Sequence, residues 1–210
     1  MDEAEALKAL NVPRETIERL EAFVALLRAE NERQNLVSRA SLEDVWSRHV
    51  YDSAQLLRFV PPGAAAWIDL GTGAGFPGLV VAALHPAKVT MVEVRKLRVD
   101  FLCRGATLLA VEDKVEILCS RVEAVPTRAF DVISARAFAP LEKLLALGER
   151  FSTTKTRWIL PKGRNAKSEL AAAESSWQGE FRLEPSLTDP DAMIVVAEGV
   201  RRRGRGKKRV

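Results

Sequence analysis

The stretch AWIDLGTGAGFPG occupies residues 66–78 and decides which fold the chain adopts. An apolar run ends at Asp69-Leu70 and passes at once into glycines at alternate positions, Gly71, Gly73 and Gly75. Such a pattern predicts a strand, a tight turn that only glycine tolerates, and a helix beginning near Pro77. The segment 73–78 also matches G-x-G-x-x-G, the dinucleotide fingerprint, which is a weak signal by itself.

Strand-like and helical runs alternate outward from this turn. The predicted strands are 66–70, 89–94, 114–119, 131–135, 157–161, 181–187 and 192–197, and the predicted helices are 77–84, 96–110, 140–151 and 166–176. This alternation predicts an α/β fold with a mostly parallel sheet covered on both faces. No helix separates the last two strands, so they predict a hairpin that adds one antiparallel strand near the C-terminus.

Composition and breaks divide the chain into three segments. Residues 1–60 show helical periodicity, with a Ser41–Asp44 capping box predicted to open a helix that reaches about Leu57. The break Pro61-Pro62-Gly63 separates them from a domain over 61–200. The last ten residues hold seven of the 32 lysines and arginines and no acidic residue, so residues 1–200 carry 25 basic against 28 acidic groups. We expect 201–210 to be a disordered basic tail, either solvated or bound to phosphates.

The charge beside the glycine turn indicates which cofactor fits it. A carboxylate at Asp69 would repel a pyrophosphate by about 4 kcal/mol at 4 Å, for an effective dielectric near 20. S-adenosylmethionine instead brings an ammonium and a sulfonium, which the carboxylate attracts. Glu93 ends the next strand, where it can accept hydrogen bonds from ribose hydroxyls. Glu123 follows the third strand and lies either near the expected adenine or on the surface as an ordinary residue. The expected architecture is a Rossmann-like class I methyltransferase sheet with an N-terminal helical extension.

Other classes of protein fit the composition less well. The acidic N-terminus and the absence of a long apolar run predict a cytoplasmic protein with no membrane contact. Two histidines, His49 and His85, and two cysteines expected as reduced core thiols offer no metal site. A dinucleotide oxidoreductase stays open as an alternative. It is the weaker one because the chain lacks a proton donor at the strand ends, where hydride transfer would need it. A non-catalytic RNA-binding module on a nucleotide fold is the other alternative.

Over residues 20–165 the chain resembles the bacterial small-subunit rRNA guanine-N7 methyltransferases, once called glucose-inhibited division protein B. The resemblance rests on the glycine stretch, on RHVYDS at 48–53, RVE at 121–123, FDVISARAF at 130–138 and LPKG at 160–163. It implies methylation of guanine N7 in 16S rRNA, on the free RNA or the small ribosomal subunit, by a protein expected to be a monomer. It also implies cofactor contacts from Gly71, Phe76, Val122, Glu123 and Arg136.

The chemistry expected at this site is in-line methyl transfer without a general base, because guanine N7 has a lone pair and no hydrogen. Arg136 is the candidate catalytic residue, positioning either guanine O6 or the cofactor, with a structural ion pair as its alternative. His49 and Asp52, with Ser53, share one helical face and form either a substrate wall or a structural patch. Lys162 ends the fifth strand within reach of a phosphate, and Phe138 either stacks on a base or packs in the core.

Overall fold

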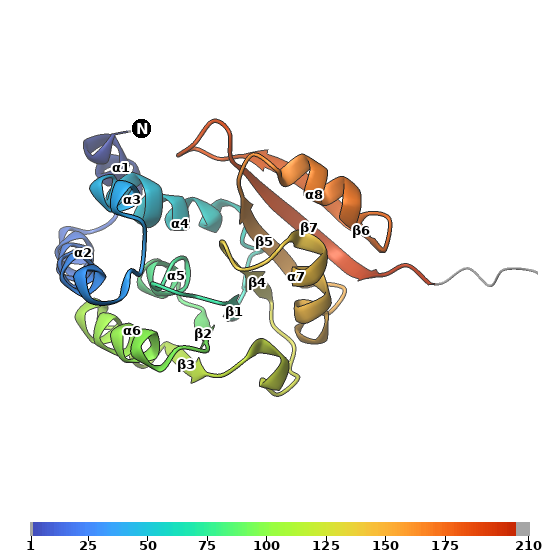
Figure 1. Ribbon diagram of the computed structural model, residues 1–210, viewed down its shortest axis with the longest axis horizontal. Helices are drawn as coiled ribbons and strands as arrows, with labels where there is room; N and C mark the ends of the chain where they lie inside the picture. The colour runs from blue at the N-terminus through green and yellow to red at the C-terminus, as the bar shows by residue number, and fades with distance from the viewer. Residues whose placement is uncertain (1, 205–210) are drawn as a thin grey trace, which may run out of the picture.

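Residues 3–59 are mostly helical, as their periodicity predicts. The computed structural model describes residues 2–204 (Figure 1). The N-terminal segment contains α1 (Glu3–Leu10), α2 (Arg14–Gln34), α3 (Arg39–Glu43), the π-helical turn η1 (Trp46–Tyr51), α4 (Asp52–Ala54) and the 3₁₀ turn η2 (Gln55–Phe59).

The predicted capping box at Ser41–Asp44 is wrong. Ser38 caps α3 instead, because its hydroxyl accepts a hydrogen bond from the Ser41 amide at 3.2 Å. Ser41 therefore lies inside the short helix, and its own hydroxyl donates back to the Ser38 carbonyl. The chain then widens into η1, a π-helical turn of the kind often found at functional sites.

The described residues form one seven-stranded sheet in the order β3-β2-β1-β4-β5-β7-β6. Its strands are β1 (Ala66–Leu70), β2 (Lys88–Glu93), β3 (Val115–Cys119), β4 (Val132–Ser134), β5 (Arg157–Lys162), β6 (Trp177–Pro185) and β7 (Met193–Arg202). The pairs among β1 to β5 are parallel, whereas β7 pairs antiparallel with both β5 and β6. The predicted mostly parallel sheet with a single reversed strand is confirmed.

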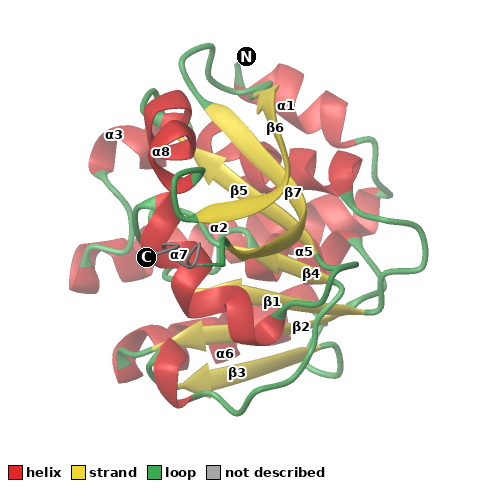
Figure 2. Cartoon of the chain, turned by 90° about the vertical axis from the view of Figure 1, so that its right-hand side faces the viewer, coloured by secondary structure: helices red, strands yellow, loops and turns green. Residues whose placement is uncertain are grey.

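Helices cover both faces of this sheet. They are α5 (Gly78–Leu84), α6 (Lys96–Leu109), α7 (Leu141–Gly148) and α8 (Ala166–Ala173), with 3₁₀ turns η3 (Val122–Ala124) and η4 (Glu149–Phe151). Figure 2 shows α7 and α8 in front of the sheet, with α2, α5 and α6 behind it. The N-terminal helices thus share a face with α5 and α6.

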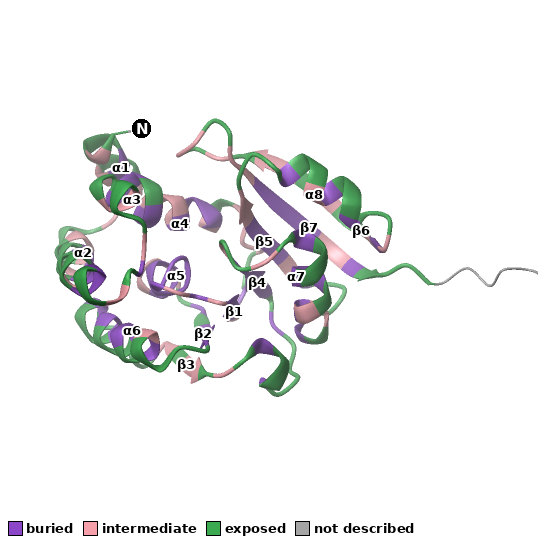
Figure 3. Cartoon of the chain, in the orientation of Figure 1, coloured by how far each residue is buried: buried purple, intermediate pink, exposed green. Residues whose placement is uncertain are grey.

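Alternation along each strand divides the core into two clusters, one on each face. In β1, Trp67 packs with the α2, α5 and α6 side, whereas Ile68 and Leu70 pack with the α7 and α8 side. The central strands are buried on both faces, as Figure 3 shows by their purple colour. This two-sided burial explains why these strands are apolar nearly throughout.

Several expectations for the surface and the C-terminus need correction. Cys103 and Cys119 are exposed thiols and do not lie in the core. Strand β7 extends to Arg202, two residues into the predicted tail at 201–210, because Arg201 and Arg202 pair with Gln178 and Trp177. The rest of the tail from residue 205 lies outside the described residues. Between residues 2 and 204 no helix is long and apolar enough to cross a membrane.

Candidate functional site

A glycine turn joins β1 to α5 at the carboxyl end of the parallel strands. Gly71, Gly73 and Gly75 have φ angles of +69°, +58° and +87°, a region that disfavours side chains. The Gly71 and Thr72 amides donate to the Val92 carbonyl at 2.9 and 3.1 Å, which fastens the turn to β2. The alternating glycines therefore permit the tight turn that the sequence predicts.

Asp69 is placed differently from the expectation. Its side chain is fully buried, and its carboxylate accepts from Ser134 Oγ at 2.7 Å and from the Gly78 amide at 3.1 Å. Burial raises the pKa of Asp69, partly offset by hydrogen bonds to the carboxylate. The carboxylate lies inside the turn, where it ties β1, β4 and the start of α5 together. Attraction of a positively charged cofactor would require this carboxylate to face the cavity, and it does not face it.

A cavity of about 770 Å³ opens beside the glycine turn, within the size range of small-molecule sites. Its walls come from six segments of the chain, which converge at the carboxyl edge of the sheet, where open α/β sheets bind ligands. The lining residues lie within segments 36–41, 48–52, 71–76, 136–140, 161–163 and 186–194, not all residues of which reach the cavity, and Arg98 and Glu169 line it in addition.

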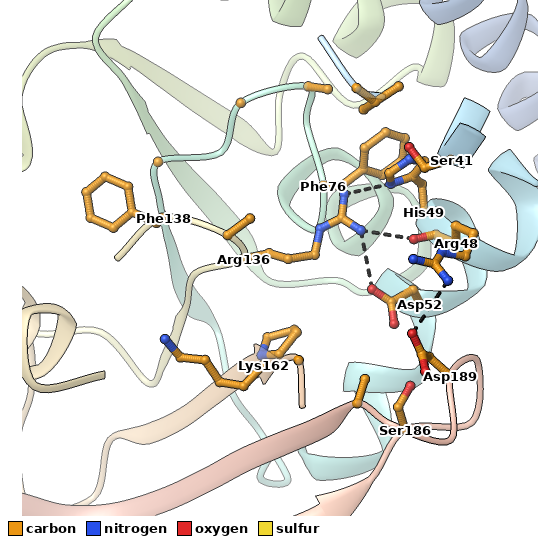
Figure 4. Close-up of a pocket in the computed structure, with 18 of the residues that line it drawn as sticks. Ser41, Arg48, His49, Asp52, Phe76, Arg136, Phe138, Lys162, Ser186 and Asp189 are labelled. Atoms are coloured by element: carbon orange, nitrogen blue, oxygen red, sulfur yellow. Dashed lines mark hydrogen bonds and ion pairs between the residues drawn. The ribbon is translucent and has the colours of Figure 1, made fainter. Parts of the chain in front are cut away.

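Arg136 reaches from the end of β4 to the N-terminal helical segment (Figure 4). Its Nη2 lies 2.8 Å from His49 Nδ1, and its Nη1 lies 3.0 Å from the Arg48 carbonyl and 3.3 Å from Asp52 Oδ2. The Phe76 ring stacks with the His49 ring at 5.0 Å, and the guanidinium carbon lies 5.3 Å from its centroid. The structure thus brings together four predicted site residues that are distant in the sequence.

Asp52 also connects this group to the β6–β7 loop. Its Oδ1 accepts from Gln55 Nε2 and from Thr188 Oγ1, both at 2.8 Å. Gln55 in turn accepts from the Leu187 amide at 2.8 Å. One carboxylate therefore contacts both Arg136 and the loop that forms the adjoining wall.

Lys162 and Phe138 lie on the other side of the cavity in Figure 4. Lys162 Nζ donates to the Ala139 carbonyl at 2.7 Å and to Glu169 Oε2 at 2.9 Å, so it is already paired. The Phe138 side chain is 38% exposed and covers Gly71, where an added Cβ would lie 2.2 Å from Phe138 Cδ2. Phe138 is therefore not a core residue, and its ring is open to a partner.

Other predicted cofactor residues do not line this cavity among the residues that the structure describes. Gly75 faces Leu79 within the turn. Glu93 is buried, accepting from the Gly73 amide at 3.2 Å and the Arg95 amide at 2.9 Å. Val122 packs in the core and Glu123 is exposed. Their contacts with an adenosine stay predictions.

Sequence reasoning missed Arg98 and the β6–β7 loop. Arg98 lies 3.6 Å from Glu93 and lines the cavity from α6, while Asp189 lies 3.5 Å from Arg48. The turn sequence TDPD at 188–191 marks a loop but carries no sign of where the loop lies. In the described part of the chain, no group of three His, Cys, Asp or Glu residues is arranged to hold a metal.

Comparison with known proteins shows which proteins this chain is similar to. Residues 16–187 match the family model GidB, rRNA small subunit methyltransferase G. The ribosomal RNA small subunit methyltransferase G of Rhizorhabdus wittichii is 50% identical over 208 residues, covering 98% of this chain and 96% of that protein. Its namesake from Zymomonas mobilis is 46% identical, covering 95% of this chain and 94% of the relative.

Solved structures share the fold at low identity. A ribosomal protein L11 methylase from Lactobacillus delbrueckii subsp. bulgaricus matches with a TM-score of 0.57 and 17% identity, over 75% of this chain and 79% of the other. A point mutant of MtNAS in complex with S-adenosylmethionine matches with a TM-score of 0.56 and 16% identity, over 86% and 74% of the two chains.

Proposed function

Because the chain belongs to the rRNA small subunit methyltransferase G family, we propose that it transfers a methyl group from S-adenosylmethionine to nitrogen 7 of a guanine in 16S rRNA. The observation that carries the proposal is the cavity of about 770 Å³ formed over the glycine turn. A substrate in the small ribosomal subunit implies a protein of the cytoplasm, and a monomer stays the expectation.

The residues around the cavity fit the proposed cofactor. Gly71, Gly73 and Phe76 line it, so backbone of the turn is within reach of a bound molecule. The amino-acid end of S-adenosylmethionine needs a donor for its carboxylate and acceptors for its ammonium. Arg136 supplies the first, and the backbone carbonyls of the turn supply the second. When bound, S-adenosylmethionine supplies a methyl group made electrophilic by the adjacent sulfonium.

The titratable groups of the cavity support a reaction that needs no general base. His49 and Asp52 both bind Arg136, and Glu169 binds Lys162 and the Leu141 amide. Each of these three side chains is thus bound to another part of the cavity wall. Guanine N7 presents a lone pair without a proton, so alignment of the two reactants is what the site has to provide.

Side chains around the cavity would align the methyl group of the cofactor with guanine N7. Arg136 donates to the cofactor carboxylate or to guanine O6, while Phe138 offers its exposed ring to a base. His49 and Asp52, expected as substrate contacts, contact Arg136 instead. Lys162 holds the 136–140 loop through the Ala139 carbonyl, and reaching a phosphate would require it to leave that carbonyl.

The test is transfer of labelled methyl from S-adenosylmethionine to small ribosomal subunits and to free 16S rRNA. We expect label in the RNA, at a guanine that becomes sensitive to N7-directed strand cleavage. Label on protein or small molecules alone would overturn the proposal. Calorimetry distinguishes the two alternatives: RNA affinity without S-adenosylmethionine binding indicates a non-catalytic RNA-binding module, and tighter binding of NAD indicates an oxidoreductase.

A further inference from the structure

The contact between Arg136 and His49 determines where the histidine carries its proton. A guanidinium has hydrogen-bond donors and no acceptor, so His49 Nδ1 must accept at 2.8 Å. The proton of the neutral ring is therefore on Nε2. A doubly protonated ring would turn an N–H toward another N–H at this distance, which is repulsive.

The surroundings of His49 keep the ring neutral. Burial lowers the pKa of His49 to about 3, and the positive charges of Arg136 and Arg48 act in the same direction. Asp52 is the carboxylate of the group, but it pairs with Arg136 at 3.3 Å. His49 thus stays an uncharged acceptor throughout the range of pH in which ribosomes work.

A neutral acceptor has a specific effect on Arg136. A carboxylate at position 49 would also hold the guanidinium but would add a second negative charge to the Arg136–Asp52 pair. A neutral histidine fixes the direction of the guanidinium without adding that charge. The Phe76 ring, stacked with the His49 ring at an interplanar angle of 23°, holds this arrangement from one side.

Packing alone does not explain a histidine at this position. His49 is 7% exposed, and among the described residues its Nε2 has no hydrogen-bond partner. A buried donor without an acceptor destabilises a fold, which an apolar ring in the same place would avoid. The contact of Nδ1 with Arg136 is an interaction that an apolar ring could not make.

We propose that His49 is a positioning residue for methyl transfer, which fixes the Arg136 guanidinium at the wall of the cavity through a neutral Nε2–H tautomer. The inference rests on the proposed function. It goes beyond it by giving the N-terminal helical segment a part in the reaction, although that segment lies outside the cofactor turn.

Three substitutions separate this role from simple packing. In His49→Asn the side-chain oxygen takes the place of Nδ1, in His49→Gln the amide lies near Nε2, and His49→Phe keeps only the ring. We expect His49→Phe and His49→Gln to lower the maximal rate of methyl transfer roughly 10- to 100-fold, and His49→Asn to stay within about fivefold of the parent. The matched control is His85→Asn, since His85 does not line the cavity.

Affinity for S-adenosylhomocysteine and the melting temperature are measured on the same variants. A parent-like rate in His49→Phe, or equal losses in His49→Asn and His49→Phe, would overturn the positioning role. A parent protein that methylates no RNA would instead defeat the proposed function, so the two failures are distinguishable.

Nuclear magnetic resonance tests the tautomer on the unaltered site. The chain has two histidines, so His85→Asn leaves His49 as the single imidazole to be assigned. We expect nitrogen-15 shifts of a neutral Nε2–H ring, unchanged between about pH 5.5 and 8, the range that contains the ordinary pKa of histidine. An Nδ1–H ring, or titration near that ordinary value, would overturn the proposal even if every His49 variant failed to fold.

Discussion

Acidification should destabilise the folded chain through His49. The pKa of a histidine in an unfolded chain is about 6.5, whereas that of folded His49 is about 3. Below pH 6.5, His49 gains a proton in the unfolded chain but stays neutral in the folded chain. The contribution of His49 to stability is therefore complete above pH 6.5 and is lost progressively as the pH falls toward 3. At pH 5.0 the loss amounts to about 2 kcal/mol relative to pH 7.5.

Urea unfolding measured by tryptophan fluorescence gives this quantity, because Trp67, Trp158 and Trp177 are buried. The free energy of unfolding is compared at pH 7.5 and 5.0 for the parent and for His49→Asn. Carboxylates and His85 titrate equally in both proteins, so they cancel in the comparison. We expect the parent to lose about 2 kcal/mol more than the variant, with equal dependence on urea. Equal pH dependence in the two proteins would show that His49 is not buried as a neutral acceptor.

Three further predictions concern the rim of the cavity and the C-terminus. Phe138→Ala should lower methyl transfer to RNA about tenfold, as expected for loss of one base stack, while affinity for S-adenosylhomocysteine changes less than about threefold; a loss of cofactor affinity alone would assign the ring to the cofactor. Asp189→Ala should change the free energy of unfolding by less than about 1 kcal/mol, because the ion pair of Asp189 with Arg48 is partly exposed and 3.5 Å long. Urea unfolding measures this change, and a larger loss would refute the prediction. Deleting residues 205–210 removes four basic residues; if they bind single-stranded RNA, the slope of log affinity against log salt should fall by up to about 3, and an unchanged slope would exclude that contact.

The strands were predictable because each is an apolar run between turn residues, and Ala66–Leu70 is recovered to the residue. The ends of β6 and β7 were less so, since no helix separates the two strands and β7 continues into the basic residues Arg201 and Arg202. The capping box failed because serine is a good cap at either position, and it is the Ser38 hydroxyl that accepts from the first turn of the helix. Local pattern predicts the elements here better than it predicts their boundaries.

The site was predictable in its residue types but not in the direction of its side chains. Asp69 shares a strand face with Trp67, two positions earlier, so its carboxylate lies under the start of α5, away from the cavity. The same alternation was readable from the sequence and would have weakened the argument from charge. In contrast, the pairing of Arg136 with His49 joins residues 87 positions apart, which no local pattern reveals.

The β6–β7 loop is a wall of the cavity that is held in place by side-chain contacts such as that of Asp52 with Thr188. Leu187 lies in this loop and is 44% exposed, as sites of proteolytic nicking commonly are. A cut between residues 187 and 191 would divide the loop whose Leu187 amide and Thr188 hydroxyl bind Gln55 and Asp52. Protease protection by S-adenosylhomocysteine would thus report directly on whether the cavity is closed around its ligand.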